Sequence, residues 1–269
     1  MIVRLQGGMG NQMFQYAFGR SVSRARNEEL LFEKRGDMRD GVARFIYSLD
    51  LFKTNVTFAT NANVGSQYDE RIFAYDKGVY TAPVGTNFIG YWQTERYYFE
   101  PEIIRAELSL RNVVSDQAQR IADEISAKPN SAFIHVRRTD YLSPEVEPWM
   151  GNLTMDYYKK AMTLIREGVS DVAFFVFSDD PEWCRQNFEG CRIIDHKNTG
   201  QDHEDLFLMS QCRHAVIANS SFSWWGAWLG DFPGKTVIAP YRWFAAPATI
   251  NIKWDAAQSD IIPKRWVTI

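Results

Sequence analysis

The chain has 269 residues, of which 45% are hydrophobic and 23% are charged, and its formal net charge is -3 at pH 7. This composition excludes a long disordered chain, and the length suits either two domains or one large α/β unit. The slightly negative charge gives no reason to expect a nucleic-acid binder, which usually presents a clustered basic face.

In the first half, the pattern predicts a strand at residues 2–6, a glycine turn, a helix at 11–25 and a strand at 30–33. The middle of this half is less regular. We expect both halves to share a doubly wound α/β character, and we divide the chain into domains at residues 1–125 and 126–269.

The second half alternates between short apolar strands and amphipathic helices. Strands are expected at 132–136, 172–177, 192–195, 215–219 and 236–240, and helices at 153–167, 181–188, 205–212 and 221–229. Strands and helices that alternate in this way form a parallel sheet covered on both faces. The pattern therefore predicts an α/β fold with a Rossmann-like domain.

Cysteine usage and the opening sequence indicate the compartment. Cys184, Cys191 and Cys212 lack the paired spacing of a disulfide framework or a zinc ribbon, which fits a reducing environment. The opening MIVRLQGGMG lacks the basic start and apolar stretch of a signal peptide, and no apolar run reaches the ~18–20 residues of a membrane span. We expect a cytoplasmic protein without a membrane span, at most peripheral to the inner membrane.

Polar residues follow three of the predicted strands at the point where each strand ends. The strings are HVRRTD (His135–Asp140), SDD (Ser178–Asp180) and NSSFS (Asn219–Ser223). The carboxyl ends of parallel strands share one edge of a sheet, where loops and helix N-termini converge and ligands bind. We therefore expect the three strings to lie together, which indicates a site more strongly than any one string does.

Each string has a structural and a functional interpretation. NSSFS can cap a helix, or its hydroxyl groups, N–H groups and helix dipole can bind a phosphate. The arginines of HVRRTD can form a surface ion-pair cluster or clamp a diphosphate, because a guanidinium binds phosphate oxygens bidentately. SDD can cap a helix that starts at Pro181, or offer a carboxylate to a ribose or to the N–H edge of guanine.

Two further strings have competing interpretations. Trp224, Trp225 and Trp228 are spaced so that they can pack down one helical flank, and we favour core packing over stacking on a sugar. GGMGNQ resembles a dinucleotide-binding turn, but Met13 stands where the third glycine belongs and would hinder close helix–strand packing. A tight glycine turn that presents Asn11 and Gln12 is the better interpretation.

The sequence resembles the α-1,2-fucosyltransferases of glycosyltransferase family 11. The strings that carry the resemblance occur in a fixed order along nearly the whole chain: GGMGNQMFQYAFGR, GYWQTERYY, HVRRTDY, FSDDPEWC and ANSSFSWWGAWL. The resemblance implies two Rossmann-like domains in a GT-B arrangement facing a central cleft. It also implies GDP-β-L-fucose as donor, inversion at the fucose anomeric carbon, and O2 of a galactose in a glycan as acceptor.

The resemblance also implies roles for individual residues. In the C-terminal domain, Arg137 is expected on the diphosphate with Arg138 also on the donor side; Ser220, Ser221 and Phe222 are expected around the phosphates and base, and His135 and Asp179 beside the nucleoside. In the N-terminal domain, Asn11 and Gln12 are expected near the transferred sugar, and Gln12, Trp92 and Gln93 toward the acceptor. Tyr91 and Trp92 can equally be packing residues at a strand end.

The sequence departs from the family pattern at two positions, and neither departure threatens the expected activity. Thr139 stands where the family usually has glycine, and Met9 where a leucine is common. HVRRTD is instead similar to the corresponding loop of the α-1,6-fucosyltransferases, in which an acid five residues beyond the aspartate is implicated as base. Glu145 occupies that position here, so the linkage is less determined than the family.

The chemistry expected of such an enzyme needs no metal and no cofactor, because the chain contains no Asp-x-Asp. Arg137 and the helix N-terminus after Asn219 are expected to stabilise the departing GDP. Glu145, Asp140 or the leaving phosphate can take the acceptor proton, and Asp140 is the more plausible orienter of the arginines. The rival functions are an NAD-type oxidoreductase, disfavoured by Met13, and a non-catalytic glycan-binding module that uses its tryptophans.

Overall fold

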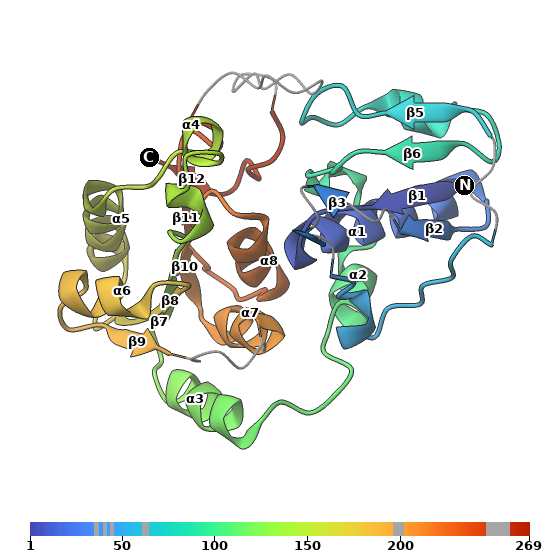
Figure 1. Ribbon diagram of the computed structural model, residues 1–269. Helices are drawn as coiled ribbons and strands as arrows, with labels where there is room; N and C mark the ends of the chain where they lie inside the picture. The colour runs from blue at the N-terminus through green and yellow to red at the C-terminus, as the bar shows by residue number, and fades with distance from the viewer. Residues whose placement is uncertain (35–37, 40–41, 44–45, 61–64, 196–201, 246–258) are drawn as a thin grey trace. The chain divides into compact units, whose positions relative to one another are not determined.

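The computed structural model describes all residues except 35–37, 40–41, 44–45, 61–64, 196–201 and 246–258 (Figure 1). The described residues form two compact units: Met1–Asn112 with residues 259–263, and residues 113–245 with Lys264–Ile269. The units divide after Asn112, whereas the predicted boundary at 125/126 falls at the end of helix α3 (Asp116–Ser126). Ser115 donates its N–H (2.6 Å) and its hydroxyl (2.9 Å) to Glu204, which anchors the start of α3 in the second unit.

The first unit contains a parallel sheet of four strands, which are β1 (Ile2–Leu5), β2 (Leu31–Lys34), β5 (Gln67–Asp69) and β6 (Asn87–Ile89). Their spatial order is β2-β1-β6-β5, and every neighbouring pair is parallel. The order reverses direction between β1 and β6. In sheets of this kind ligands bind at such a reversal, beyond the carboxyl ends of the strands.

Shorter elements complete the first unit. They are β3 (Met38–Arg39), β4 (Val42–Ala43), η1 (Leu49–Leu51), η2 (Lys77–Tyr80), η3 (Glu95–Tyr97) and α2 (Pro101–Glu107). Helix α1 (Met9–Arg26) follows β1 directly and buries Met13, Phe14, Ala17 and Phe18 completely. The predicted strand, glycine turn, helix and strand of this half are therefore confirmed.

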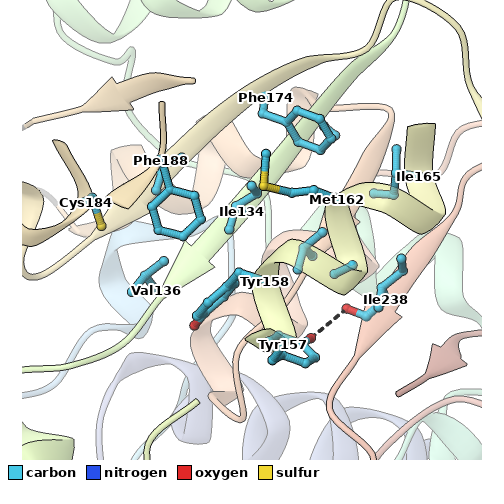
Figure 2. Close-up of a cluster of buried hydrophobic side chains, with 14 residues drawn as sticks. Ile134, Val136, Tyr157, Tyr158, Met162, Ile165, Phe174, Cys184, Phe188 and Ile238 are labelled. Atoms are coloured by element: carbon cyan, nitrogen blue, oxygen red, sulfur yellow. Dashed lines mark hydrogen bonds between the residues drawn. The ribbon is translucent and has the colours of Figure 1, made fainter. Parts of the chain in front are cut away.

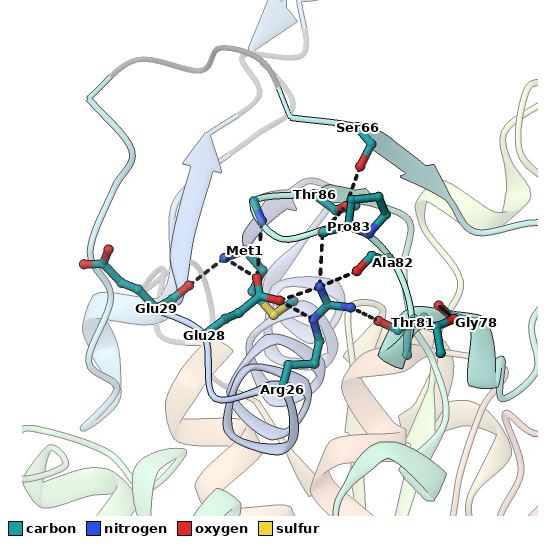
Figure 3. A network of polar contacts seen from close by, with 12 residues as sticks. Met1, Arg26, Glu28, Glu29, Ser66, Gly78, Thr81, Ala82, Pro83 and Thr86 are labelled. Carbon is teal, nitrogen blue, oxygen red and sulfur yellow. Dashed lines mark hydrogen bonds and ion pairs between the residues drawn. The ribbon is translucent and has the colours of Figure 1, made fainter.

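A polar network fixes the end of α1 (Figure 3). The helix stops at Asn27, which adopts a left-handed backbone with φ 53°. Arg26 pairs with Glu28 and donates hydrogen bonds to the carbonyls of Val79 (2.6 Å) and Ala82 (2.7 Å). Burial alone would raise the pKa of Glu28, but hydrogen bonding to Arg26 lowers it. The buried guanidinium thus ties the segment before β6 to the C-terminus of α1.

The second unit contains a parallel sheet of six strands. They are β7 (Ser131–Val136), β8 (Ala173–Ser178), β9 (Arg192–Ile194), β10 (His214–Val216), β11 (Val237–Ala239) and β12 (Val267–Thr268). The order is β12-β11-β10-β7-β8-β9 with parallel pairing throughout, so the direction reverses between β7 and β10. The predicted parallel Rossmann-like sheet is confirmed, and each of its expected strands is present.

Helices cover both faces of this sheet, α5 and α6 on one side and α7 and α8 on the other (Figure 1). The helices on the two faces are α5 (Met155–Gly168), α6 (Pro181–Asn187), α7 (Asp202–Gln211) and α8 (Ser221–Leu229). The unit also contains α3 and the short helices η4 (Asp140–Leu142) and α4 (Glu147–Met150). Figure 2 shows α5 packing Tyr158, Met162 and Ile165 against Ile134 and Phe174 of the sheet.

The tryptophans of α8 are core residues. Trp224 and Trp225 are completely buried, and their rings lie 4.9 Å apart in an edge-to-face arrangement. Trp224 also stacks on Trp228 at 6.0 Å and contacts Trp266 at 5.4 Å. The prediction of core packing over sugar stacking is therefore confirmed. The cluster packs α8 into the core and so positions the helix N-terminus at the sheet edge.

Candidate functional site

The three polar strings of the second unit meet at the reversal point of its sheet. The strings follow β7, β8 and β10, and the first of these strands is paired with each of the other two. Tyr141 donates its hydroxyl to the carbonyl of Asn219 at 2.9 Å, and the N–H of Arg138 donates to Asp179 at 2.9 Å. The loop after β7 is therefore fastened to both neighbouring loops, as the sequence predicts.

Asp179 anchors that loop. Its carboxylate accepts hydrogen bonds from the N–H groups of Arg138 and Thr139, and from the Thr139 hydroxyl at 2.6 Å. The Nη1 atom of Arg137 lies 3.3 Å from it. These contacts occupy both carboxylate oxygens, so in this conformation Asp179 positions the loop rather than facing a nucleoside.

The next acid caps a helix. Asp180 accepts the N–H of Trp183 at 3.1 Å and so begins α6, which starts with Pro181 as expected for a helix cap. It also pairs with the Nε atom of Arg138 at 3.1 Å, while the Arg138 guanidinium stacks over the Trp183 ring at 4.0 Å. Arg138 is thus held between α6 and the loop, which assigns it mainly to the scaffold.

Arg137 is the more available of the two arginines, with 36% of its side chain exposed against 16% for Arg138. Its Nε atom lies 2.7 Å from Asp140, which therefore orients the guanidinium. Burial alone would lower the pKa of Arg137, but the hydrogen bond to Asp140 and the charges of Asp179 and Asp140 raise it. The group is a permanent, oriented cation that can meet an anion at the sheet edge.

The N-terminus of α8 supplies a second positive feature. Ser220 begins the helix without a side-chain capping hydrogen bond, and the first turn holds no acidic residue. Asn219 is locked, because its side-chain amide donates to the carbonyls of Met150 (2.6 Å) and Trp243 (3.1 Å). Ser221 and Phe222 are half-buried on the first turn. This arrangement therefore favours the phosphate-binding interpretation of NSSFS over the capping interpretation.

His135 lies beside this helix N-terminus. Its ring centroid is 5.6 Å from that of Phe222, and within the described structure its buried Nδ1 has no hydrogen-bond partner. Burial, together with the charge of Arg137, lowers the pKa of His135 to about 3. The imidazole is therefore neutral at physiological pH and presents an unused polar atom.

Glu145 lies between η4 and α4 on the same long loop and is exposed. Its backbone carbonyl accepts a hydrogen bond from the indole N–H of Trp149 at 2.9 Å. The contact leaves the carboxylate accessible to solvent, as a base acting on a bound acceptor requires.

In the first unit, the turns after β1 and β6 meet at the reversal between these strands. The side-chain amide of Gln93 donates to Asn11 Oδ1 at 2.8 Å. Gln15 of α1 joins both turns, since it accepts the N–H of Gln6 (3.0 Å) and donates to the carbonyl of Gly90 (3.1 Å). Gly7 has φ +74°, and an added Cβ there would lie 2.5 Å from Asn11 Nδ2. Asn11 and Gln93 are thus paired at the expected edge.

Two predicted acceptor residues are structural instead. Gln12 is fully buried, donates to the carbonyls of Gly7 and Ile46, and accepts the N–H of Ser48, so its amide is satisfied by the backbone. Trp92 is 1% exposed and stacks on Phe18 with ring centroids 4.2 Å apart. The alternative interpretation of Trp92 as a packing residue fits this placement, and neither side chain reaches solvent.

Neither a metal-binding cluster nor a membrane-spanning helix is found among the residues that the structure describes. No group of three or more His, Cys, Asp or Glu side chains there is arranged to hold a metal ion. Within the same residues, every helix is too short or too polar to cross a bilayer.

Comparison with known proteins identifies the family. The model of glycosyltransferase family 11 matches residues 1–269. The chain belongs to this family. An α-1,2-colitosyltransferase of Escherichia coli is 31% identical to this family 11 chain, covering 100% of it and 98% of the relative. Galactoside α-(1,2)-fucosyltransferase 2 of Rattus norvegicus is 28% identical, covering 98% of the chain and 75% of the relative.

Solved structures confirm the fold class of this family 11 protein. The α-1,6-fucosyltransferase NodZ of Bradyrhizobium, co-crystallized with GDP, superposes with a TM-score of 0.54 at 12% identity, covering 84% of this chain and 90% of that one. At this identity the likeness shows the fold alone. The predicted α/β class with two Rossmann-like domains of the GT-B type is confirmed.

Sequence reasoning missed residues that hold the site together. Tyr141 links the loop after β7 to Asn219 through its hydroxyl. The only sequence signal for this role is its place at the end of HVRRTDY. Gln15 lies in GGMGNQMFQYAFGR, and its spacing of four residues from Asn11 indicates that the two share a helix face. Glu70, described below, stands in an irregular stretch and carries no sequence signal.

Proposed function

We propose that this family 11 glycosyltransferase moves L-fucose from GDP-β-L-fucose to the 2-hydroxyl of a galactose in a glycan, with inversion. The observation that carries the proposal is the oriented cation Arg137 beside the uncapped N-terminus of α8, at the reversal point of a parallel sheet. Relatives named α-(1,2)-fucosyltransferases support the sugar and the linkage. NodZ structures with GDP and with GDP-fucose support a GDP-linked donor.

Arg137 and the first turn of α8 would hold the diphosphate and stabilise the negative charge that grows on it as the bond to fucose breaks. This positive charge would stabilise the leaving group without a metal, so activity should need no metal. Phe222 and the neutral His135 would border the nucleoside, and Asn11 with Gln93 would contact sugar hydroxyl groups. Asp140 is engaged by Arg137, which favours Glu145 as the base.

A second donor has a specific argument in its favour. The Escherichia coli relative that aligns with the whole chain is named a colitosyltransferase, which makes colitose an alternative transferred sugar. An α-1,6 linkage is a weaker alternative, because NodZ is similar in fold alone.

A donor-and-acceptor screen tests these alternatives. Purified protein is incubated with GDP-fucose or GDP-colitose and a panel of galactosides, and the product linkage is determined by NMR. An α-1,2-fucosylated galactoside is expected. Preferential colitose transfer would replace the donor, and an α-1,6 product would replace the linkage. Glycan binding without turnover or any effect of guanine nucleotides would indicate a binding module.

A further inference from the structure

The first unit contains a buried acid that the proposed chemistry does not use. Glu70 directly follows β5 and is 7% exposed. Its Oε2 atom accepts the N–H of Tyr91 at 2.6 Å, and its Oε1 atom accepts the N–H of Trp92 at 3.1 Å. In the described part of the chain no basic side chain pairs with this carboxylate. Two successive backbone N–H groups are its main polar partners, an arrangement that binds anions.

These contacts shape the turn that follows β6. Trp92 has φ 56°, in the left-handed region that side-chain-bearing residues rarely adopt, so the turn needs external support. Gly90 provides room for the acid, since an added Cβ there would lie 2.4 Å from the Glu70 Cβ. A carboxylate suits this place because it offers two acceptor oxygens, whereas an amide offers one and turns an N–H toward the other donor.

The turn ends at Gln93, which pairs with Asn11 at the edge of the first unit's sheet. Gln93 is 6% exposed and is directed by its hydrogen bond to Asn11. Its Oε1 atom is buried and has no partner among the described residues. Burial and the hydrogen bond to Asn11 leave the Gln93 amide few alternative orientations, so the backbone of residues 90–93 decides where the Gln93–Asn11 pair lies.

We propose that Glu70 is a positioning residue, whose carboxylate holds the 90–93 turn and thereby sets the Gln93–Asn11 pair for contact with a sugar hydroxyl. The inference rests on the proposed function, because it assigns Gln93 and Asn11 to substrate. Burial raises the pKa of Glu70 to about 7, since only the two backbone N–H groups offset the loss of solvent. The two hydrogen bonds that the ionised carboxylate accepts explain why an acid stands at this buried position.

The test compares Glu70→Gln and Glu70→Ala with Asp69→Asn, a matched control that changes the neighbouring exposed acid at the end of β5. Turnover is first measured for the unmodified protein. If that protein transfers no sugar from either donor, the proposed function fails at this step, independently of Glu70. Hydrogen exchange of the Tyr91 and Trp92 amides is measured in all variants and does not depend on activity.

We expect Glu70→Ala to lower kcat/KM for transfer by up to about 100-fold, the scale of a small misplacement of a reacting group. Glu70→Gln should retain more activity, because its amide oxygen still accepts one of the two N–H groups. GDP affinity should stay within about twofold in both variants, since the residues assigned to GDP lie in the second unit. Both amides should exchange faster in Glu70→Ala, and Asp69→Asn should match the unmodified protein in every measurement.

A double-mutant cycle with Gln93→Ala distinguishes positioning from general stability. If Glu70 acts through Gln93, Glu70→Gln lowers turnover in the natural background and has little further effect in Gln93→Ala. Additive losses would overturn the proposal, as would unchanged turnover in Glu70→Gln with faster amide exchange. A fall in GDP affinity equal to the fall in turnover would likewise show a merely structural role.

Discussion

Replacement of Arg137 by lysine keeps the formal charge and removes the geometry. The guanidinium faces two acids at once, Asp140 at 2.7 Å through Nε and Asp179 at 3.3 Å through Nη1. These contacts fix the plane of the group and the direction of its remaining N–H bonds. A lysine ammonium is a compact charge on a flexible stem and cannot reproduce this orientation. We therefore expect Arg137→Lys to nearly abolish transfer in a folded protein.

The expected loss of activity is that of removing one preorganised donor. Loss of one preorganised donor to a developing negative charge costs ~3–4 kcal/mol, or roughly 10²–10³ in kcat. Binding of GDP should weaken less than turnover falls, because the charge on the diphosphate grows as the bond to the sugar breaks. The expected pattern is a large fall in kcat with a GDP affinity reduced by about tenfold or less.

The assay combines steady-state turnover with GDP binding by calorimetry, and circular dichroism verifies folding. Arg185→Lys is the matched control. Arg185 lies on α6, has a similar exposure (41%) and also contacts two acids, Glu182 and Asp195. The control should retain normal turnover. Near-normal turnover of Arg137→Lys would refute the reasoning and transfer the diphosphate contact to Arg138.

Four further outcomes are expected. Turnover persists in EDTA, since fixed positive groups stabilise the leaving GDP; loss of activity that manganese restores would contradict this. Glu145→Gln lowers kcat with little change in GDP affinity if Glu145 is the base, and unchanged turnover would point to the phosphate or another acid. Because the pKa of His135 falls from 6.5 to about 3 on folding, wild-type stability declines as the pH drops below about 6.5, and His135→Asn should flatten this slope in urea titrations. Trp224→Ala should lower the free energy of unfolding by about 3–5 kcal/mol, whereas a loss under 1 kcal/mol would show that the indole cluster adds little.

The amino-acid sequence was enough to predict the opening strand, helix and strand of the first unit and most of the alternating strands and helices of the second. It also predicted the edge at which the polar residues gather. Apolar runs such as AFIHV and VAFFVF read as buried parallel strands because a strand covered on both faces needs no alternation. Asp180 before Pro181 marked a helix start through local backbone chemistry. The three polar strings could be brought together without coordinates, because parallel strands direct their carboxyl ends to one edge.

Which polar side chains face inward depends on tertiary contacts that the sequence does not reveal. Asp69 and Glu70 are adjacent acids with similar chemistry, yet Asp69 is exposed while Glu70 is buried against the N–H groups of Tyr91 and Trp92. The sequence predicts Gln12 and Trp92 on the acceptor side, but Gln12 is hydrogen-bonded to the backbone of a distant segment and Trp92 is buried against Phe18. A residue's type and spacing fix its local geometry, whereas its burial depends on what other segments bring to it, and burial decides whether a polar group meets a ligand or the protein itself.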